Sequence, residues 1–436
     1  MRTAIFLAVL ALAACRDRFP TYDEPFEAKN LLMISVDTYR RDYLTRYGST
    51  RGLTPFMDEL ASRSLVLDDH SSCSDWTLPS VLCVGAGRHE PAYGFISRLG
   101  PTFREVAPEH TTLAGWLREQ GFYSILMTSN SWLESEWNHD SGYDYAEHPG
   151  TDDGARIWEL GRDKLFEAQA EGLAGEDRWF LHIHLKEPHS PYNPPSEYLD
   201  GLEDLPPIDY DLATNTDHDE ARYALSSMDE EERAAVLAHL LLRYNGEMAY
   251  EDDILEAIWD DANARGLLKN TVVSFWTDHG EQQYEREHWG HAFQLFQEES
   301  GAVALFWHPD IEPAAWTGPT SHIDLAPTVL EMFGFPIPEE IEGQPVGQAP
   351  ADRTLFGITV ANVGPLLQAT RAGLRMHYDY DSGALAVYDL IADPGEEHDL
   401  YDPFDPNQTS LWEELSAWAD SIEPLLGEYT RVDPPR

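Results

Sequence analysis

Two aspartates and two histidines stand at or just past the ends of strand-like segments: Asp37, His189, Asp278 and His279. Each follows a short run of apolar, β-branched and aromatic residues that is typical of a buried strand. These runs cover residues 31–36, 179–185 and 271–277. The carboxyl ends of parallel strands share one edge of a sheet, where ligands bind. The carboxylate and imidazole groups therefore predict a site for a hard or borderline divalent cation.

Each of these residues also has a structural interpretation that needs no ligand. Asp37 can cap the next helix, Asp278 can form a turn, and His189 lies in a proline-flanked loop. Only their joint placement after separate apolar runs favours a binding site.

The order of elements predicts an α/β fold with a mostly parallel central sheet. Two further strand-like runs, at 123–128 and 303–307, alternate with helical patterns such as 111–120 and 246–265. Because the strands are apolar throughout, we expect helices on both faces of the sheet. Proline can occupy the first turn of two of these helices, at Pro55 and Pro79.

The remaining segments predict an insertion and a second, smaller unit. Residues 201–226 are acidic and Pro/Asp-rich, which indicates a loop, and Ser227 begins a capping-box pattern that predicts the start of a helix. After residue 350, short strands at 357–360, 375–380 and 384–390 precede a final helix at 410–422. We therefore expect a main domain at 30–350 and a small α+β subdomain at 351–436.

The N-terminus resembles the signal of a bacterial lipoprotein. An apolar run over 4–14 is too short to span a bilayer but suits a secretion signal. The run ends in Leu-Ala-Ala-Cys15, which resembles a lipobox. We expect a signal peptide at 1–14, lipidation of Cys15 and a tether at 15–29. This predicts an extracytoplasmic, lipid-anchored protein, and Arg16 after the cysteine favours the outer membrane or cell surface; an ordinary cleaved signal is the alternative.

Cys73 and Cys83 would then lie in an oxidising compartment, where a disulfide can persist. Their spacing does not establish whether the two Cα atoms approach closely enough for a bridge. A disulfide and two small buried thiols therefore both stay open.

The charge balance excludes one class of partner. The formal net charge is −49, and the few lysines and arginines form no cluster. Such a surface repels polyanions, which excludes nucleic acid. With 42% hydrophobic residues the composition is otherwise that of a globular protein.

Several motifs, in one order, resemble the sulfatase family of the alkaline-phosphatase superfamily. The motifs are Asn-Leu-Leu-Met-Ile-Ser-Val-Asp-Thr-Tyr-Arg at 30–40, Trp-Thr-Leu-Pro-Ser at 76–80, His-Ser-Pro-Tyr-Asn-Pro-Pro at 189–195 and Thr-Asp-His-Gly-Glu at 277–281. Weaker likenesses extend the match to about residue 401. The resemblance implies an alkaline-phosphatase-like fold, an anionic ester as substrate, and one divalent cation.

Position by position, the resemblance implies roles for named residues. The metal ligands would be Asp37, Thr77, Asp278 and His279. Thr77 would also be the nucleophile, because it stands where the family has the residue that is converted to formylglycine. Two histidines would contact ester oxygens or protonate the leaving group, His189 and His291. Three further residues would bind substrate, Asn130, Lys186 and His288.

Four departures from the family pattern change these expectations. Threonine cannot become formylglycine, so the aldehyde-hydrate route is closed. A phosphate ester as substrate therefore becomes more favoured, relative to a sulfate ester, than the resemblance alone implies. Val81 replaces an arginine beside the nucleophile, and Thr-Ser-Asn at 128–130 replaces a Lys-x-His, so positive charges aimed at the anion are lost. His279 moves the metal preference from the family's usual Ca²⁺ toward Mn²⁺ or Zn²⁺.

We therefore expect a metal-dependent hydrolase that cleaves a sulfate or phosphate ester of a glycan, lipid or small molecule through Thr77. Two alternatives stay open. One is a transferase of the same superfamily that moves a phospho-alcohol group with Thr77 as carrier. The other is a binding protein on a sulfatase scaffold that turns over no ester.

Overall fold

The computed structural model of the protein describes residues 28–89, 111–133, 139–361, 363–426 and 429–434. The expected signal peptide, Cys15 and most of the tether lie outside these residues. The end of the tether already belongs to the fold, because the Lys29 amide donates to the Asn270 carbonyl oxygen at 2.7 Å. Over the described ranges, no helix is both long and apolar enough to cross a membrane.

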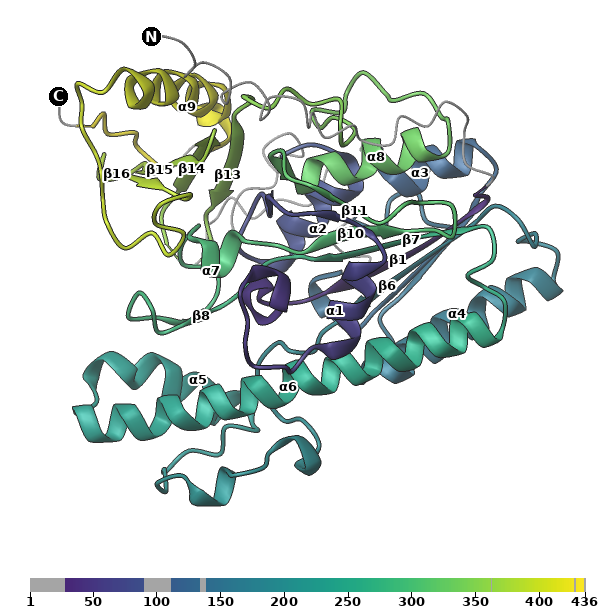
Figure 1. The fold of residues 1–436 in the computed structure, drawn as a ribbon, viewed down its shortest axis with the longest axis horizontal. Coiled ribbons are helices and arrows are strands. Elements are labelled where there is room, and N and C mark those ends of the chain that lie inside the picture. Colours follow the sequence, from purple (N-terminus) through teal and green to yellow (C-terminus); the bar gives the residue numbers. More distant parts are fainter. Residues whose placement is uncertain (1–27, 90–110, 134–138, 362, 427–428, 435–436) are drawn as a thin grey trace, which may run out of the picture.

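An eight-stranded sheet runs through the main domain in the order β11-β2-β10-β7-β1-β6-β4-β5 (Figure 1). Neighbouring strands pair in parallel except where β10 joins β7 and β2. Five strands match the predicted runs: β1 (Asn30–Val36), β4 (Tyr123–Thr128), β6 (Trp179–Leu185), β7 (Thr271–Thr277) and β10 (Ala304–Trp307). Three short strands were not predicted: β2 (Leu65–Leu67), β5 (Tyr145–Glu147) and β11 (Ala314–Trp316). The predicted mostly parallel sheet is confirmed.

Helices cover both faces of the sheet (Figure 1). One face packs against α1 (Pro55–Ser62), α4 (Gly154–Ala170) and α6 (Glu230–Ala264). The other packs against α2 (Thr77–Ala86), α3 (Leu113–Glu119) and α8 (Leu325–Met332). Alternation along β1 separates the two cores, since Ile34 belongs to the first and Met33 to the second. Pro55 and Pro79 lie in first helical turns, as expected.

The expectations for the region before α6 are wrong in two respects. The N-cap of α6 is Asp229, whose side chain accepts from the Glu232 amide, whereas the Ser227 hydroxyl donates to the Ala224 carbonyl oxygen at 2.8 Å. The predicted loop at 201–226 contains a helix, α5 (Asn215–Ala224).

The C-terminal subdomain is a four-stranded antiparallel sheet with one helix. Its elements are β13 (Leu355–Thr359), β14 (Leu366–Arg371), β15 (Leu374–Asp379), β16 (Leu385–Asp389) and α9 (Pro406–Leu426). The second of these strands was not predicted. The Ser74 hydroxyl donates to the Ile358 carbonyl oxygen at 2.8 Å, so this sheet is tied to the segment that precedes α2.

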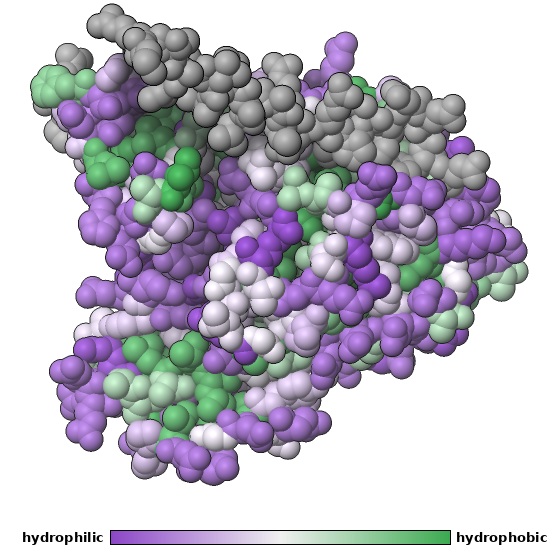
Figure 2. All heavy atoms as spheres, viewed as in Figure 1, coloured by the Kyte–Doolittle hydropathy of each residue, from purple (hydrophilic) through white to green (hydrophobic). Residues whose placement is uncertain are grey.

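Small elements complete the described chain: β3 (His70–Ser71), β8 (Gln282–Gln283), β9 (Trp289–Gly290), β12 (Thr320–Ser321) and α7 (Gln297–Ser300). Hydrophilic residues cover most of the face shown in Figure 2, as the net charge of −49 implies.

Candidate active site

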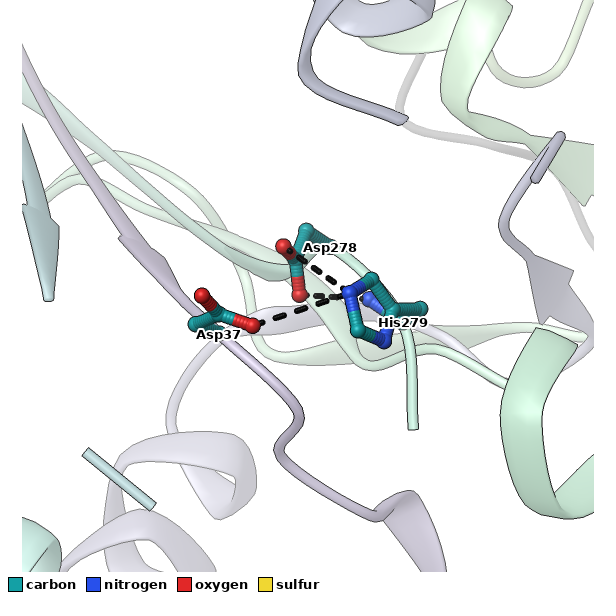
Figure 3. Close-up of side chains that lie close together, drawn as sticks. All are labelled: Asp37, Asp278 and His279. Carbon is teal, nitrogen blue, oxygen red and sulfur yellow. Dashed lines mark hydrogen bonds and ion pairs between the residues drawn. The ribbon is translucent and has the colours of Figure 1, made fainter. Parts of the chain in front are cut away.

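Asp37, Asp278 and His279 meet at the carboxyl edge of the sheet (Figure 3). They follow β1 and β7, which pair in parallel with Val36 opposite Thr277, so the next residues of the two strands emerge side by side. His279 Nε2 lies 3.6 Å from Asp37 Oδ1 and 3.4 Å from Asp278 Oδ2. All three side chains are buried. The residues predicted from the strand ends are thus brought together.

The backbone around this group holds Asp278 by one oxygen. The amides of His279 and Thr38 donate to Asp278 Oδ1 at 2.7 and 3.1 Å. Thr38 has a φ of 51°, a conformation that β-branched residues rarely adopt. The chain therefore accepts local strain at a turn that fixes a site aspartate.

The atoms that face one another have no hydrogen-bond partner among the described residues: Asp37 Oδ1, Asp278 Oδ2 and His279 Nε2. His279 Nδ1 lies 2.8 Å from the Gly280 carbonyl oxygen, which can only accept, so Nδ1 carries the proton and Nε2 presents a lone pair. Burial, and then the charge of Asp37, raises the pKa of Asp278 well above its usual value. Burial lowers the pKa of His279 well below its usual value. Two carboxylates and a neutral imidazole, all buried, fit a divalent cation.

Thr77 stands beside this group, at the first position of α2. Its Oγ1 lies 3.5 Å from Asp37 Oδ2. Asn130, just past β4, donates through Nδ2 to the same carboxylate oxygen at 2.6 Å and to Thr77 Oγ1 at 3.3 Å. An amide nitrogen has two hydrogens, so both bonds can form at once. Asn130 therefore holds Thr77 and Asp37 together, a contact that its predicted role in substrate binding did not include.

A disulfide joins Cys73 and Cys83, whose Cα atoms are 6.7 Å apart. The sequence left this bridge and two thiols open, and the structure contains the bridge. It connects the segment before Thr77 to the body of α2 and so fixes the start of that helix.

His189 and His291 form the opposite wall, with ring centroids 5.1 Å apart. His189 Nδ1 lies 2.6 Å from the Ser190 carbonyl oxygen, so Nδ1 keeps its proton and Nε2 is the atom that can exchange one. His291 Nδ1 lies 3.3 Å from Glu281 Oε2. Both predicted histidines therefore reach the site with fixed ring orientations.

Glu281 and Tyr192 support this wall, and no role was predicted for either. The Tyr192 hydroxyl donates to Glu281 Oε1, and burial raises the pKa of Glu281 to about 7. Both residues lie inside motifs that carry the family resemblance. Their presence in the same motifs as His189 and His279 was the available signal.

Thr77, Asn130, Lys186, His189 and His291 all line a cavity of about 230 Å³. The Lys186 ammonium donates to Asp152 at 2.7 Å, so its charge is already paired.

Of the predicted substrate-binding residues, His288 lies apart from this cavity. It is exposed and stacks on Phe293 with ring centroids 4.9 Å apart. Arg40, the arginine that ends the motif around Asp37, donates to Asp42 and Glu285 at 2.9 and 2.6 Å. The geometry therefore supports no substrate contact for His288. The charge of Arg40 is already neutralised by the two carboxylates.

Comparison with known proteins places this site in a family. The family model described as Sulfatase matches residues 29–335. An ulvan-active sulfatase of Formosa agariphila is 24% identical over 98% of this chain and 88% of its own length. A structure solved with its substrate D-glucosamine-2-N,6-O-disulfate superposes with a TM-score of 0.71 at 15% identity, over 91% of this chain and 98% of that one. A phosphonate monoester hydrolase from Silicibacter pomeroyi gives 0.67 at 17% identity, over 91% and 94%.

Proposed function

The chain belongs to the sulfatase family of hydrolases, and from that premise we propose that it cleaves a sulfate or phosphate ester with Thr77 as nucleophile and one divalent cation as cofactor. The observation that carries the proposal is the set of three buried, unpartnered ligand atoms on Asp37, Asp278 and His279, with Thr77 Oγ1 beside them. From Cys15 we further propose an extracytoplasmic protein held by a lipid anchor.

A cation bound between Asp37, Asp278 and His279 would lower the pKa of the Thr77 hydroxyl and offset the charge of the ester. Asp37 Oδ2, 3.5 Å from Thr77 Oγ1, is placed to take the hydroxyl proton. Oγ1 then bonds to sulfur or phosphorus as the bond to the leaving alcohol breaks, and protonated His189 gives the alkoxide a proton from Nε2.

The second half of the reaction restores the enzyme. Water attacks the sulfur or phosphorus of the threonine ester and gives a proton to His189. Thr77 leaves with the proton held by Asp37, and sulfate or phosphate is released. Because no aldehyde hydrate is available to eject sulfate, we favour phosphate esters. The shared fold of a phosphonate monoester hydrolase supports this preference distantly.

A non-catalytic binding protein is the second candidate. It is favoured by the pairing of Lys186 with Asp152 and by Val81 and Asn130, which leave few positive groups for an anion. That candidate predicts metal binding without turnover of any ester.

The test couples metal analysis of the purified protein to a screen of aryl sulfate, aryl phosphate and phosphodiester substrates. We expect one bound divalent ion and a Thr77→Ala variant with kcat/KM lower by about 10³-fold or more. Thr409→Ala, at an exposed position of α9, is the matched control and should keep the wild-type rate. A Thr77→Ala protein with the wild-type rate would remove the mechanism. Metal binding with no turnover would establish the second candidate instead.

A further inference from the structure

A second, larger pocket of about 640 Å³ adjoins the cavity at Thr77. Asp152, Lys186 and His189 line both, so the two spaces are neighbours. An ester held at Thr77 with its leaving oxygen at His189 would extend its alcohol part into this pocket. The residues that line the pocket therefore help to determine which alcohol can be the leaving group of the ester.

The pocket is acidic. Four carboxyl side chains line it against one ammonium group: Asp152, Asp153, Glu187 and Glu247 against Lys186. The ammonium is paired with Asp152 at 2.7 Å, and Asp153 accepts from the Arg156 amide as the N-cap of α4. Arg243 lies near Glu247, but its Nη1 donates to the Tyr192 carbonyl oxygen at 3.1 Å. The two glutamates therefore have no close ion-pair partner among the described residues.

Backbone amides hold both glutamates, Glu247 and Glu187, in the wall of the pocket. Glu247 on α6 is only 5% exposed, and its Oε1 accepts from the Asn193 amide at 2.5 Å. Its Oε2 has no hydrogen-bond partner in the described part of the chain and lines the pocket. Glu187 Oε1 accepts from the Gly154 amide at 3.1 Å, and its buried Oε2 is likewise unpartnered. Behind them lies Glu251, fully buried, with both oxygens unpartnered.

Three neighbouring, buried carboxyl side chains are unfavourable in their ionised form without a cation nearby. Burial first, and then neighbouring carboxylates, raise the pKa of Glu247 to about 8 and that of Glu187 to about 7. The pKa of Glu251 is raised well above its usual value for the same two reasons. A positive charge in the pocket would stabilise the ionised forms.

The spacing of the carboxylates indicates what kind of cation fits. Among the described residues, only Asp37, Asp278 and His279 bring three ligand atoms within 4.8 Å of one another. Glu187, Glu247 and Glu251 do not form such a group. An organic ammonium group is larger, and it is attracted to carboxylates and ring faces without tight coordination. The lining also includes Tyr250 and three prolines: Pro191, Pro194 and Pro195.

We propose that this acidic pocket binds an ammonium group on the alcohol part of the substrate, so that the preferred ester carries both an anionic ester group and a cationic amine. The inference rests on the proposed function for the position of the ester. It separates this chain from enzymes for polyanionic glycans, because a second sulfate in this pocket would meet four carboxyl groups.

The test compares esters of two alcohols that have equal shape and different charge. Phosphate and sulfate esters of 2-(trimethylammonio)ethanol are compared with those of 3,3-dimethylbutanol. We expect the wild-type kcat/KM to be at least about tenfold higher for the charged ester. Glu247→Gln and Glu187→Gln should each lower the ratio of kcat/KM for the charged ester to that for the neutral ester by about tenfold. Glu256→Gln, an exposed position of the same helix α6, removes the same charge and should leave this ratio unchanged.

A binding experiment separates this proposal from the proposed function. Calorimetry with 2-(trimethylammonio)ethanol needs no turnover, and binding should survive Thr77→Ala and weaken about tenfold in Glu247→Gln. Ammonium binding without hydrolysis of any ester would overturn the proposed function and leave the pocket's ligand established. Equal use of the two esters, or equal loss of both in the glutamate variants, would overturn the inference alone. A second Ca²⁺ ion that is lost in Glu247→Gln would also overturn it, because the pocket would then be a metal site.

Discussion

Two buried charged clusters in this protein differ in whether all of their polar atoms have hydrogen-bond partners. In the C-terminal subdomain, Glu396 accepts from the Gln297 amide at 2.8 Å, from Arg375 Nη1 at 3.3 Å and from His377 Nε2 at 2.8 Å. Both of its oxygens are thus satisfied within the fold. At the sheet edge, Asp278 keeps an oxygen with no hydrogen-bond partner among the described residues.

The pKa values move in opposite directions for that reason. Burial acts to raise the pKa of Glu396, but the charge of Arg375 and then the bond to His377 outweigh it and lower the pKa to about 2. Burial raises the pKa of Asp278, and the nearby charge of Asp37 adds to the effect. The cluster of Glu396 is therefore complete as a structural element, whereas the cluster of Asp278 keeps atoms without a partner, as the proposed cation site requires.

The largest expected effect comes from Asp278→Asn. It removes a ligand that is unfavourable in the metal-free fold, so we expect kcat/KM to fall by about 10³-fold or more and metal binding to be lost. The unfolding free energy of the metal-free protein should stay the same or rise. Ester hydrolysis, metal analysis and urea denaturation in the presence of a chelator measure the three quantities. An active variant that is less stable than wild type would mean that Asp278 is structural, like Glu396.

Arg375→Met should have the opposite pattern. It leaves Glu396 buried without its cation, which is expected to lower the free energy of unfolding by about 3–5 kcal/mol. Arg371→Met is the control, because its partner Glu414 is 42% exposed and such pairs contribute at most about 1 kcal/mol. Urea midpoints of the two variants provide the comparison, and kcat per folded molecule should not change. Equal midpoints would show that the burial of the Glu396 cluster contributes little.

The meeting of Asp37, Asp278 and His279 could be predicted from sequence because it depends on strand ends. Asp37 and Asp278 follow continuous apolar runs, and parallel pairing brings the ends of such runs together whatever the details of packing. The three-residue strands β2, β5 and β11 carry too little pattern to be recognised. α5 was missed because its segment is acidic and its short apolar face is not distinct.

The pairing of side chains could not be predicted in the same way. Lys186 pairs with Asp152, and Glu396 pairs with Arg375. The partners are far apart in sequence, and no local sequence pattern predicts that they come together. Asn130 was expected to bind substrate, but its hydrogen bonds to Asp37 and Thr77 depend on where β4 ends relative to α2. His288 lies close to His291 in sequence, yet the turn between β8 and β9 carries it to the surface.

The pH dependence of stability gives a smaller and more specific test. The folded pKa of Glu396 is below its usual value, so its ionisation stabilises the fold above about pH 5, and that contribution is lost as the pH falls toward 2. The shift from 4.5 to about 2 corresponds to roughly 3 kcal/mol. The stability difference between wild type and Glu396→Gln should therefore shrink from pH 7 to pH 3 in urea denaturation. A difference that is constant with pH would show that Glu396 stabilises by packing rather than by charge.

Salt should produce the smallest effect and distinguish surface charge from both buried clusters. The net charge of −49 repels an anionic ester before it reaches the site, and added salt screens that field over a distance of about 8 Å at physiological strength. The value of kcat/KM for an aryl phosphate should therefore hold or rise, by less than about threefold, between low and moderate salt. The buried pairs are screened much less, so the stability loss in Arg375→Met should not change over the same range. A steep fall of kcat/KM with salt would mean that positive groups, and not the acidic surface, control the approach of the substrate.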